Sequence, residues 1–121
     1  MLTPMDRRKT GLWIVTGLVA LTFLATGAGK LAAIPPSPEN FTRWNLSMNF
    51  MRLVGAAEIA GGLGLLVPRL APLAALGLGA ILVGALRTGI VFHETLHVLL
   101  PSVLLVLLAI IAWGRSTKPA R

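Results

Sequence analysis

Residues 53–63 read Leu53-Val54-Gly55-Ala56-Ala57-Glu58-Ile59-Ala60-Gly61-Gly62-Leu63, an apolar run with one carboxylate at its centre. This run belongs to one of four apolar blocks, which predict helices over about 11–33, 51–67, 72–92 and 98–113. Each block is close to the ~20 residues that a helix, rising ~1.5 Å per residue, needs to cross the hydrocarbon of a bilayer. We therefore predict an all-α fold, an integral membrane four-helix bundle in which residues 1–121 form a single transmembrane domain.

The composition supports this class. Of the 121 residues, 55% are hydrophobic and 12% are charged, and the mean hydropathy is +0.82. A soluble domain would carry about a quarter charged residues. The blocks show no alternation of period two, which favours helices over barrel strands, because a helix satisfies its own backbone groups in lipid. The chain has no cysteine, so disulfides and thiolate metal sites are excluded.

Positive residues flank the predicted spans unevenly. They precede the first block, lie in the second connection and follow the last block: Arg7, Arg8, Lys9, Arg69, Arg115, Lys118 and Arg121. This bias predicts that both termini are cytoplasmic. Contact with anionic lipid headgroups accounts for the net charge of +7, so the lipid bilayer is the expected partner and nucleic acid is not. The first block is longer than the apolar region of a signal peptide, although small residues at 25–29 keep cleavage as an alternative.

The first connection is the longest. Ser37 followed by Pro38 and Glu39 is typical of a helix start, with serine as the N-cap. Apolar residues then recur at helical spacing, namely Phe41, Trp44, Met48 and Met51. We predict a short amphipathic interfacial helix over about 38–50, between the first and second spans. It would anchor the bundle at the membrane surface or act as a gate over a site.

Ionisable residues inside predicted spans indicate a functional site by default. Glu58 lies near mid-membrane in the second span, and an ion pair with Arg87 of the third span would satisfy both charges. A purely structural pair is the alternative. Lys30 either reaches inward or extends to the interface from its helix end. Gly55, Gly61 and Gly62 lie three or four residues from Glu58 and leave space for another helix or for a small ligand.

These residues form the predicted site. The candidate catalytic residues are Glu58 and Arg87, and the candidate ligand-binding residues are Lys30, Gly55, Glu58, Gly61, Gly62 and Arg87. The string His93-Glu94-Thr95-Leu96-His97 matches a zinc-binding pattern that needs both imidazoles on one helical face. Because Pro101 would kink or break a helix through these residues, we predict no metal site and keep His93 and His97 only as a weak metal-binding alternative.

Two motifs carry a resemblance to a known family. Gly29-Lys30-Leu31 and Glu58-Ile59-Ala60-Gly61-Gly62, together with Gly84-Ala85 and Pro101, resemble the DoxX-like family of small four-helix membrane proteins over roughly Thr10 to Arg115. The resemblance implies a bacterial cytoplasmic (inner) membrane location and, for some relatives, an association with quinone-linked redox systems. Members often carry a histidine directly after the threonine late in the third helix, where this chain has Gly89 after Thr88.

Three functions follow from the residues and the resemblance. The first is an accessory protein or subunit of a quinone-linked redox system that binds a lipophilic molecule near Glu58, with a membrane redox protein or a second copy as partner. The second is a membrane-embedded enzyme, such as an isomerase or an epoxide-opening enzyme, that uses acid-base catalysis. The third is a small proton-coupled exporter, which the uneven positive charge disfavours. Whether the protein is an enzyme, and whether quinone is its cofactor, stays open at this point.

Overall fold

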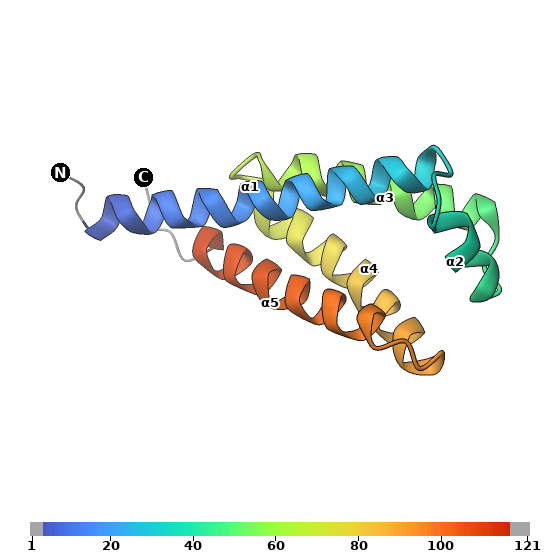
Figure 1. The fold of residues 1–121 in the computed structure, drawn as a ribbon. Coiled ribbons are helices and arrows are strands. Elements are labelled where there is room, and N and C mark those ends of the chain that lie inside the picture. Colours follow the sequence, from blue (N-terminus) through green and yellow to red (C-terminus); the bar gives the residue numbers. More distant parts are fainter. Residues whose placement is uncertain (1–3, 117–121) are drawn as a thin grey trace.

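The computed structural model describes residues 4–116, which form five α-helices and no strand (Figure 1). The helices are α1 (Pro4–Leu31), α2 (Ser37–Arg43), α3 (Met48–Leu65), α4 (Ala71–Val91) and α5 (Leu96–Ser116). This confirms the all-helical class predicted from the apolar blocks.

The long helices form two antiparallel pairs. Helix α1 packs along α3, and α4 packs along α5, while α3 also contacts α4 and α1 also contacts α5. The two pairs meet at the end where α1 begins and α5 ends, and they diverge toward the end where α2 lies (Figure 1). The buried apolar cluster lies where the pairs meet, with Phe23 from α1, Leu65 from α3, Leu78 from α4 and Ile111 from α5.

The helix boundaries differ from the predicted ranges in ways that have local causes. Helix α1 begins at Pro4 and so includes the positive residues that precede the first apolar block. The expected interfacial helix over 38–50 is interrupted: α2 ends at Arg43, and Asn45 adopts the left-handed conformation with φ 61°. Ser47 then caps α3, its side chain accepting a hydrogen bond from the backbone N–H of Phe50.

Two further details correct the sequence analysis. Pro36, not Ser37, is the N-cap residue of α2, and no side chain caps that helix. Helix α5 begins at Leu96 and continues through Pro101, so the interruption expected between His93 and Pro101 lies before this helix, in the turn that holds His93. The predicted fourth helix therefore begins two residues earlier than 98.

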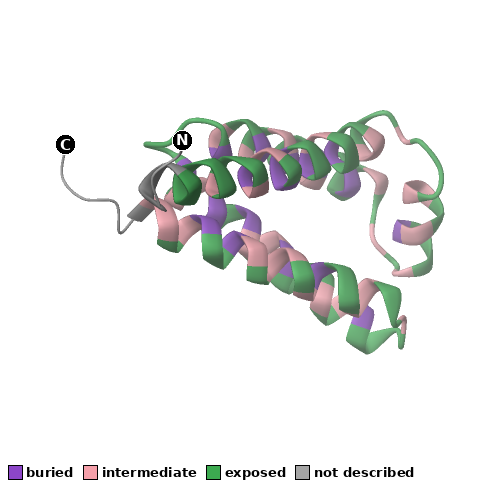
Figure 2. Cartoon of the chain, turned by 60° about the vertical axis from the view of Figure 1, so that its left-hand side comes forward, coloured by how far each residue is buried: buried purple, intermediate pink, exposed green. Residues whose placement is uncertain are grey.

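Within the part of the chain that the structure describes, three helices are long and apolar enough to cross a membrane: residues Arg7–Leu31, Ala71–Val91 and Leu96–Arg115. Helix α3 is not among them, because its 18 residues include Asn49, Arg52 and Glu58, which lower its hydropathy. Large apolar side chains are exposed on all the long helices, including Leu18, Leu53, Leu73 and Val103. Exposed residues lie along the length of each long helix (Figure 2). Surfaces of this kind suit lipid and are rare on soluble monomers.

Candidate functional site

The structure brings Lys30 and Glu58 together. Lys30 lies in the last turn of α1, and its Nζ donates a hydrogen bond to Oε1 of Glu58 on α3 at 3.0 Å. Oγ1 of Thr26 lies 3.4 Å from the same oxygen. The side chains of Lys30 and Glu58 are 18% and 7% exposed, so this is a largely buried ion pair. Among residues 4–116, no side chain donates to Oε2 of Glu58.

A close crossing of two helix backbones places this pair. A Cβ added at Gly27 of α1 would lie 2.6 Å from the carbonyl oxygen of Gly55 on α3, and one added at Gly55 would lie 2.7 Å from the carbonyl oxygen of Gly27. Only glycines permit this approach, which is the use that membrane helices make of small residues. Lys30 and Glu58 each follow one of these glycines by three residues.

The aliphatic part of the Lys30 side chain packs directly against Gly55. The Cβ of Lys30 lies 2.8 Å from the position that a Gly55 Cβ would occupy. Any side chain at residue 55 would therefore displace the lysine as well as the backbone of α1. Of the two uses we expected for the space beside Glu58, another helix or a small ligand, the helix and its lysine occupy the side next to Gly55.

The other two glycines near Glu58 also face helices. A Cβ added at Gly62 would lie 3.1 Å from the carbonyl oxygen of Ala20 on α1, and one added at Gly61 would lie 2.5 Å from the side chain of Leu78 on α4. Both glycines thus contribute to helix packing. They position α3 between α1 and α4 with Glu58 one turn away.

The structure does not bring Arg87 to Glu58, contrary to the expected pair. Arg87 is exposed on α4, and within the described part of the chain it forms no ion pair. The reason is lateral arrangement: α4 contacts α3 near Leu78, early in its length, and Arg87 lies late in α4, where the helix pairs diverge (Figure 1). The expected pair was based only on positions along the helices. The lateral arrangement of α3 and α4 keeps Arg87 away from Glu58.

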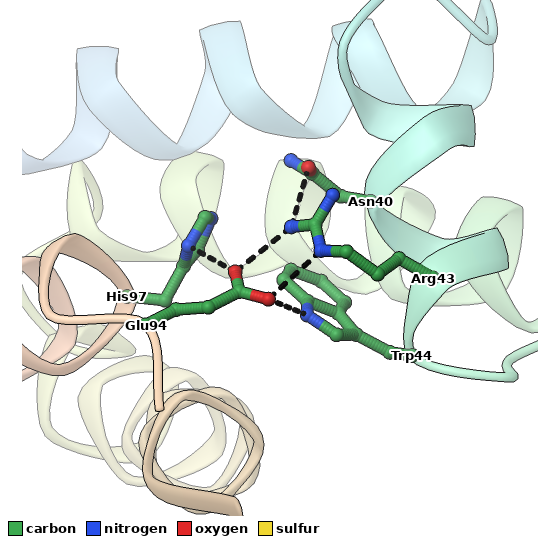
Figure 3. Close-up of polar contacts among 5 residues, drawn as sticks. All are labelled: Asn40, Arg43, Trp44, Glu94 and His97. Carbon is green, nitrogen blue, oxygen red and sulfur yellow. Dashed lines mark hydrogen bonds and ion pairs between the residues drawn. The ribbon is translucent and has the colours of Figure 1, made fainter. Parts of the chain in front are cut away.

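A second polar group, the Glu94 cluster, lies at the diverging end (Figure 3). It consists of Asn40, Arg43, Trp44, Glu94 and His97. Arg43 donates two hydrogen bonds to the Glu94 carboxylate, from Nε to Oε2 at 2.8 Å and from Nη2 to Oε1 at 2.8 Å. The indole N–H of Trp44 donates to Oε2 at 3.1 Å, and Nδ1 of His97 lies 3.0 Å from Oε1. The cluster thus connects α2 to the α4–α5 connection.

Electrostatics favours the ionised carboxylate in this cluster. The hydrogen bond from Arg43 lowers the pKa of Glu94 to about 2, with further lowering from Trp44 and from the charges of Arg43 and His97. In turn, the hydrogen bond to Glu94 raises the pKa of Arg43. Glu94 is therefore an anion at any pH at which the protein would ordinarily work, and the arginine contact persists.

The histidines do not adopt the zinc-binding arrangement. His93 lies in the turn after α4 with φ 57°, whereas His97 lies in the first turn of α5, so the two imidazoles are not on one helical face. Nδ1 of His97 instead contacts Glu94, and its ring packs edge-on against Trp44 with centroids 5.0 Å apart. Within residues 4–116, no group of three or more histidine or acidic side chains could hold a metal ion.

Sequence reasoning missed Thr26 and the partners of Glu94. Thr26 precedes the crossing glycine by one residue, and its hydroxyl is the kind of small polar group that membrane helices use between spans. Arg43 and Glu94 are separated by 51 residues, so no local pattern links them. The available signal was the polar face of the expected interfacial helix, which carries Asn40 and Arg43.

Comparison with protein families gives one match. The model of the DoxX-like family matches residues 14–111, which covers most of the chain and contains Lys30, Glu58 and Glu94. No curated protein and no solved structure matches the chain significantly.

Proposed function

The chain belongs to the DoxX-like family, and we propose that it is a small membrane protein that binds a quinone-like molecule at the Lys30–Glu58 pair. It would act as an accessory protein or subunit of a quinone-linked redox system. The observation that carries this proposal is a largely buried ion pair between two membrane helices, with Oε2 of Glu58 left without a donor among the described residues.

The proposal includes a membrane arrangement. Helix α3 is the fourth membrane helix, shielded by α1 and α4, and its 18 residues rise about 27 Å, close to the ~30 Å hydrocarbon thickness. The start of α1 and the end of α5 then face the cytoplasm of a bacterium, as the positive residues there favour. Glu58 then lies near the middle of the membrane, about 15 Å from the start of α3 by helical rise, Lys30 reaches it from the outer end of α1, and the Glu94 cluster lies at the outer surface.

Energetics favours a functional role for the pair. Removing two charges from water costs several kcal/mol of desolvation free energy each. Their attraction offsets this cost only with good geometry and full hydrogen bonding. Apolar residues of similar volume would hold α1 and α3 together at least as well. A pair at this depth, whose Oε2 has no donor among the described residues, is better explained by a ligand than by stability.

The groups present suit a quinone. Lys30 has three N–H donors, of which one is used by Glu58, so another can donate to a quinone carbonyl oxygen. Reduction of a quinone to a quinol takes two electrons and two protons. A partner redox protein would supply the two electrons. Glu58, a carboxylate in the ion pair, would take up each proton from water and pass it to a quinone oxygen. Nothing in this step requires the chain to hold a redox centre of its own.

A titration tests the proposal. Purified protein in mild detergent is titrated with a short-chain ubiquinone analogue, and the quinones that copurify are extracted and measured. We expect binding to the parent and to Arg87→Gln, which changes an exposed charge outside the site, and loss of binding in Glu58→Gln. If the parent holds no quinone and binds no analogue, or if Glu58→Gln binds as well as the parent, the proposal is wrong.

The same geometry supports one alternative. A proton donor and a proton acceptor 3.0 Å apart in an apolar surrounding are also the parts of an acid-base enzyme acting on a lipid-soluble substrate. In that case Lys30, and not Arg87, would accompany Glu58. Turnover of a lipophilic substrate by the isolated protein, without a redox partner, would favour the enzyme over the accessory protein.

A further inference from the structure

A hollow lies between α1 and α5 at the opposite end of the protein from the Glu94 cluster. Its volume is about 280 Å³. Its lining includes Arg7, Arg8, Leu12 and Val15 from α1 with Ile110 and Trp113 from α5. Arg7 is the first residue of the apolar span of α1, so the mouth of the hollow falls where that span begins.

The lining changes character along its length. Arg7 and Arg8 are exposed at the mouth, and the guanidinium carbon of Arg8 lies 5.6 Å from the centre of the Trp113 ring. Leu12, Val15 and Ile110 supply the apolar remainder. From Arg7 to Val15 the hollow extends about 12 Å along α1 by helical rise. It therefore combines a cationic mouth with an apolar wall that leads into the membrane span.

Among the side chains that the structure describes, no carboxylate pairs with the positive charge at this end. The ion pairs of the described residues involve Lys30, Arg43 and His97, and neither Arg7 nor Arg8 takes part in one. The sequence has a single acid near this end, Asp6. On the neighbouring flank, Arg115 lies 4.4 Å above the Trp13 ring, and its Nε and Nη2 are buried without a hydrogen-bond acceptor among the described residues.

From this geometry we infer that the hollow between α1 and α5 binds one anionic phospholipid, with its phosphate at Arg7 and Arg8 and an acyl chain along Leu12, Val15 and Ile110. Basic pockets between membrane helices on the cytoplasmic side bind anionic headgroups in this way. Trp13 and Trp113 mark the headgroup level, where tryptophan is enriched. The apolar wall favours a lipid over a free phosphate ion, since a small anion would make no contact with that wall. The site is separate from Lys30 and Glu58, and the inference does not depend on the quinone proposal.

Native mass spectrometry of the full chain, titrated in detergent with phosphatidylglycerol or phosphatidylcholine, tests the inference. The variant Arg7→Gln/Arg8→Gln removes both charges at the mouth, and we expect its affinity for phosphatidylglycerol to fall about 30-fold. Arg69→Gln is the control for charge, because Arg69 lies in the α3–α4 connection and not in the hollow. Thermal unfolding of each variant checks that it is folded.

A second pair of variants tests the shape of the hollow. A Cβ added at Gly11, which lines the hollow, meets no atom within 4 Å, so Gly11→Leu fills the space without a clash at its Cβ. Gly84→Leu is the matched control, since a Cβ at Gly84 also meets nothing and this residue is exposed on α4. We expect Gly11→Leu to lose bound phosphatidylglycerol and Gly84→Leu to retain it.

Three results would overturn the inference. One is equal affinity of the parent for the anionic and the zwitterionic lipid. Another is unchanged phosphatidylglycerol binding in both Arg7→Gln/Arg8→Gln and Gly11→Leu. The third is displacement of phosphatidylglycerol by millimolar inorganic phosphate, which would identify the site as one for small anions.

Discussion

Lys30 and Glu58 hold corresponding places on two antiparallel helices, because each follows by three residues the glycine at which α1 and α3 cross. The 3.0 Å contact between Nζ and Oε1 is thus a product of the Gly27–Gly55 approach and not of side-chain reach alone. Without these two glycines the helix axes would lie farther apart. The carboxylate would then face either lipid or an unfilled space.

Replacing one partner of the Lys30–Glu58 pair should lower the free energy of unfolding more than replacing both. We expect Lys30→Met and Glu58→Leu each to reduce the free energy of unfolding by about 3 kcal/mol, because each leaves one largely buried charge without its partner. The double variant should lose less than either single variant. Unfolding in mixed micelles of the four proteins gives the coupling energy directly. Additive losses would mean that the two charges do not interact.

Widening the crossing should displace the pair. Gly27→Ala places a Cβ 2.6 Å from the carbonyl oxygen of Gly55, so we expect a loss of about 1–3 kcal/mol of stability from overpacking. Gly29→Ala is the control on the same helix, because its Cβ meets no atom within 4 Å. Alanine has the higher helix propensity by about 1 kcal/mol, so this control should be neutral or stabilised. Equal effects of the two substitutions on thermal unfolding would contradict a close crossing at Gly27.

In acid, the contact between α2 and the α4–α5 connection in the Glu94 cluster should open. Since the pKa of Glu94 is lowered from 4.5 to about 2, its ionised form stabilises the folded arrangement fully above about pH 4.5, and this contribution is lost as pH falls toward 2. Glu94→Gln should produce the same opening at pH 7.

Spin labels can measure this opening, because the chain has no native cysteine. Labels at Thr42→Cys and Thr95→Cys report the distance between the end of α2 and the α4–α5 connection, and both residues are exposed. We expect a narrow distance distribution at pH 7 that broadens near pH 2 or in Glu94→Gln. Glu39→Gln, an exposed acid outside the cluster, should leave it narrow. A distribution unchanged by Glu94→Gln would show that the cluster does not hold the two parts together.

The sequence predicted the long helices, because their positions depend on local properties. Apolar blocks of nearly membrane-spanning length locate the helices, and Glu58 stands out within its run. The boundaries differed where backbone conformation decided them, as at Asn45, whose left-handed φ of 61° separates α2 from α3. Side-chain patterns carry little information about such single residues.

The pairing of charges could not be predicted in the same way. Lys30 and Arg87 are both cations at a suitable depth, and the choice between them depends on which helix crosses α3 at its glycines. Gly55 and Gly62 face α1, whereas Gly61 faces α4. The spacing of small residues predicts that a face packs closely but does not identify the helix that packs on it. Contacts such as Arg43 to Glu94 depend on the same lateral arrangement.

Photolabelling tests the central claim most directly. A quinone analogue that carries a diazirine is bound to the protein in membranes and activated, and the labelled peptides are identified by mass spectrometry. The account predicts labels on residues 26–31 of α1 and 55–59 of α3, competed by excess quinone, lost in Glu58→Gln and retained in Arg87→Gln. Labels confined to α4 and α5, or labelling of α1 and α3 that persists in Glu58→Gln, would contradict it.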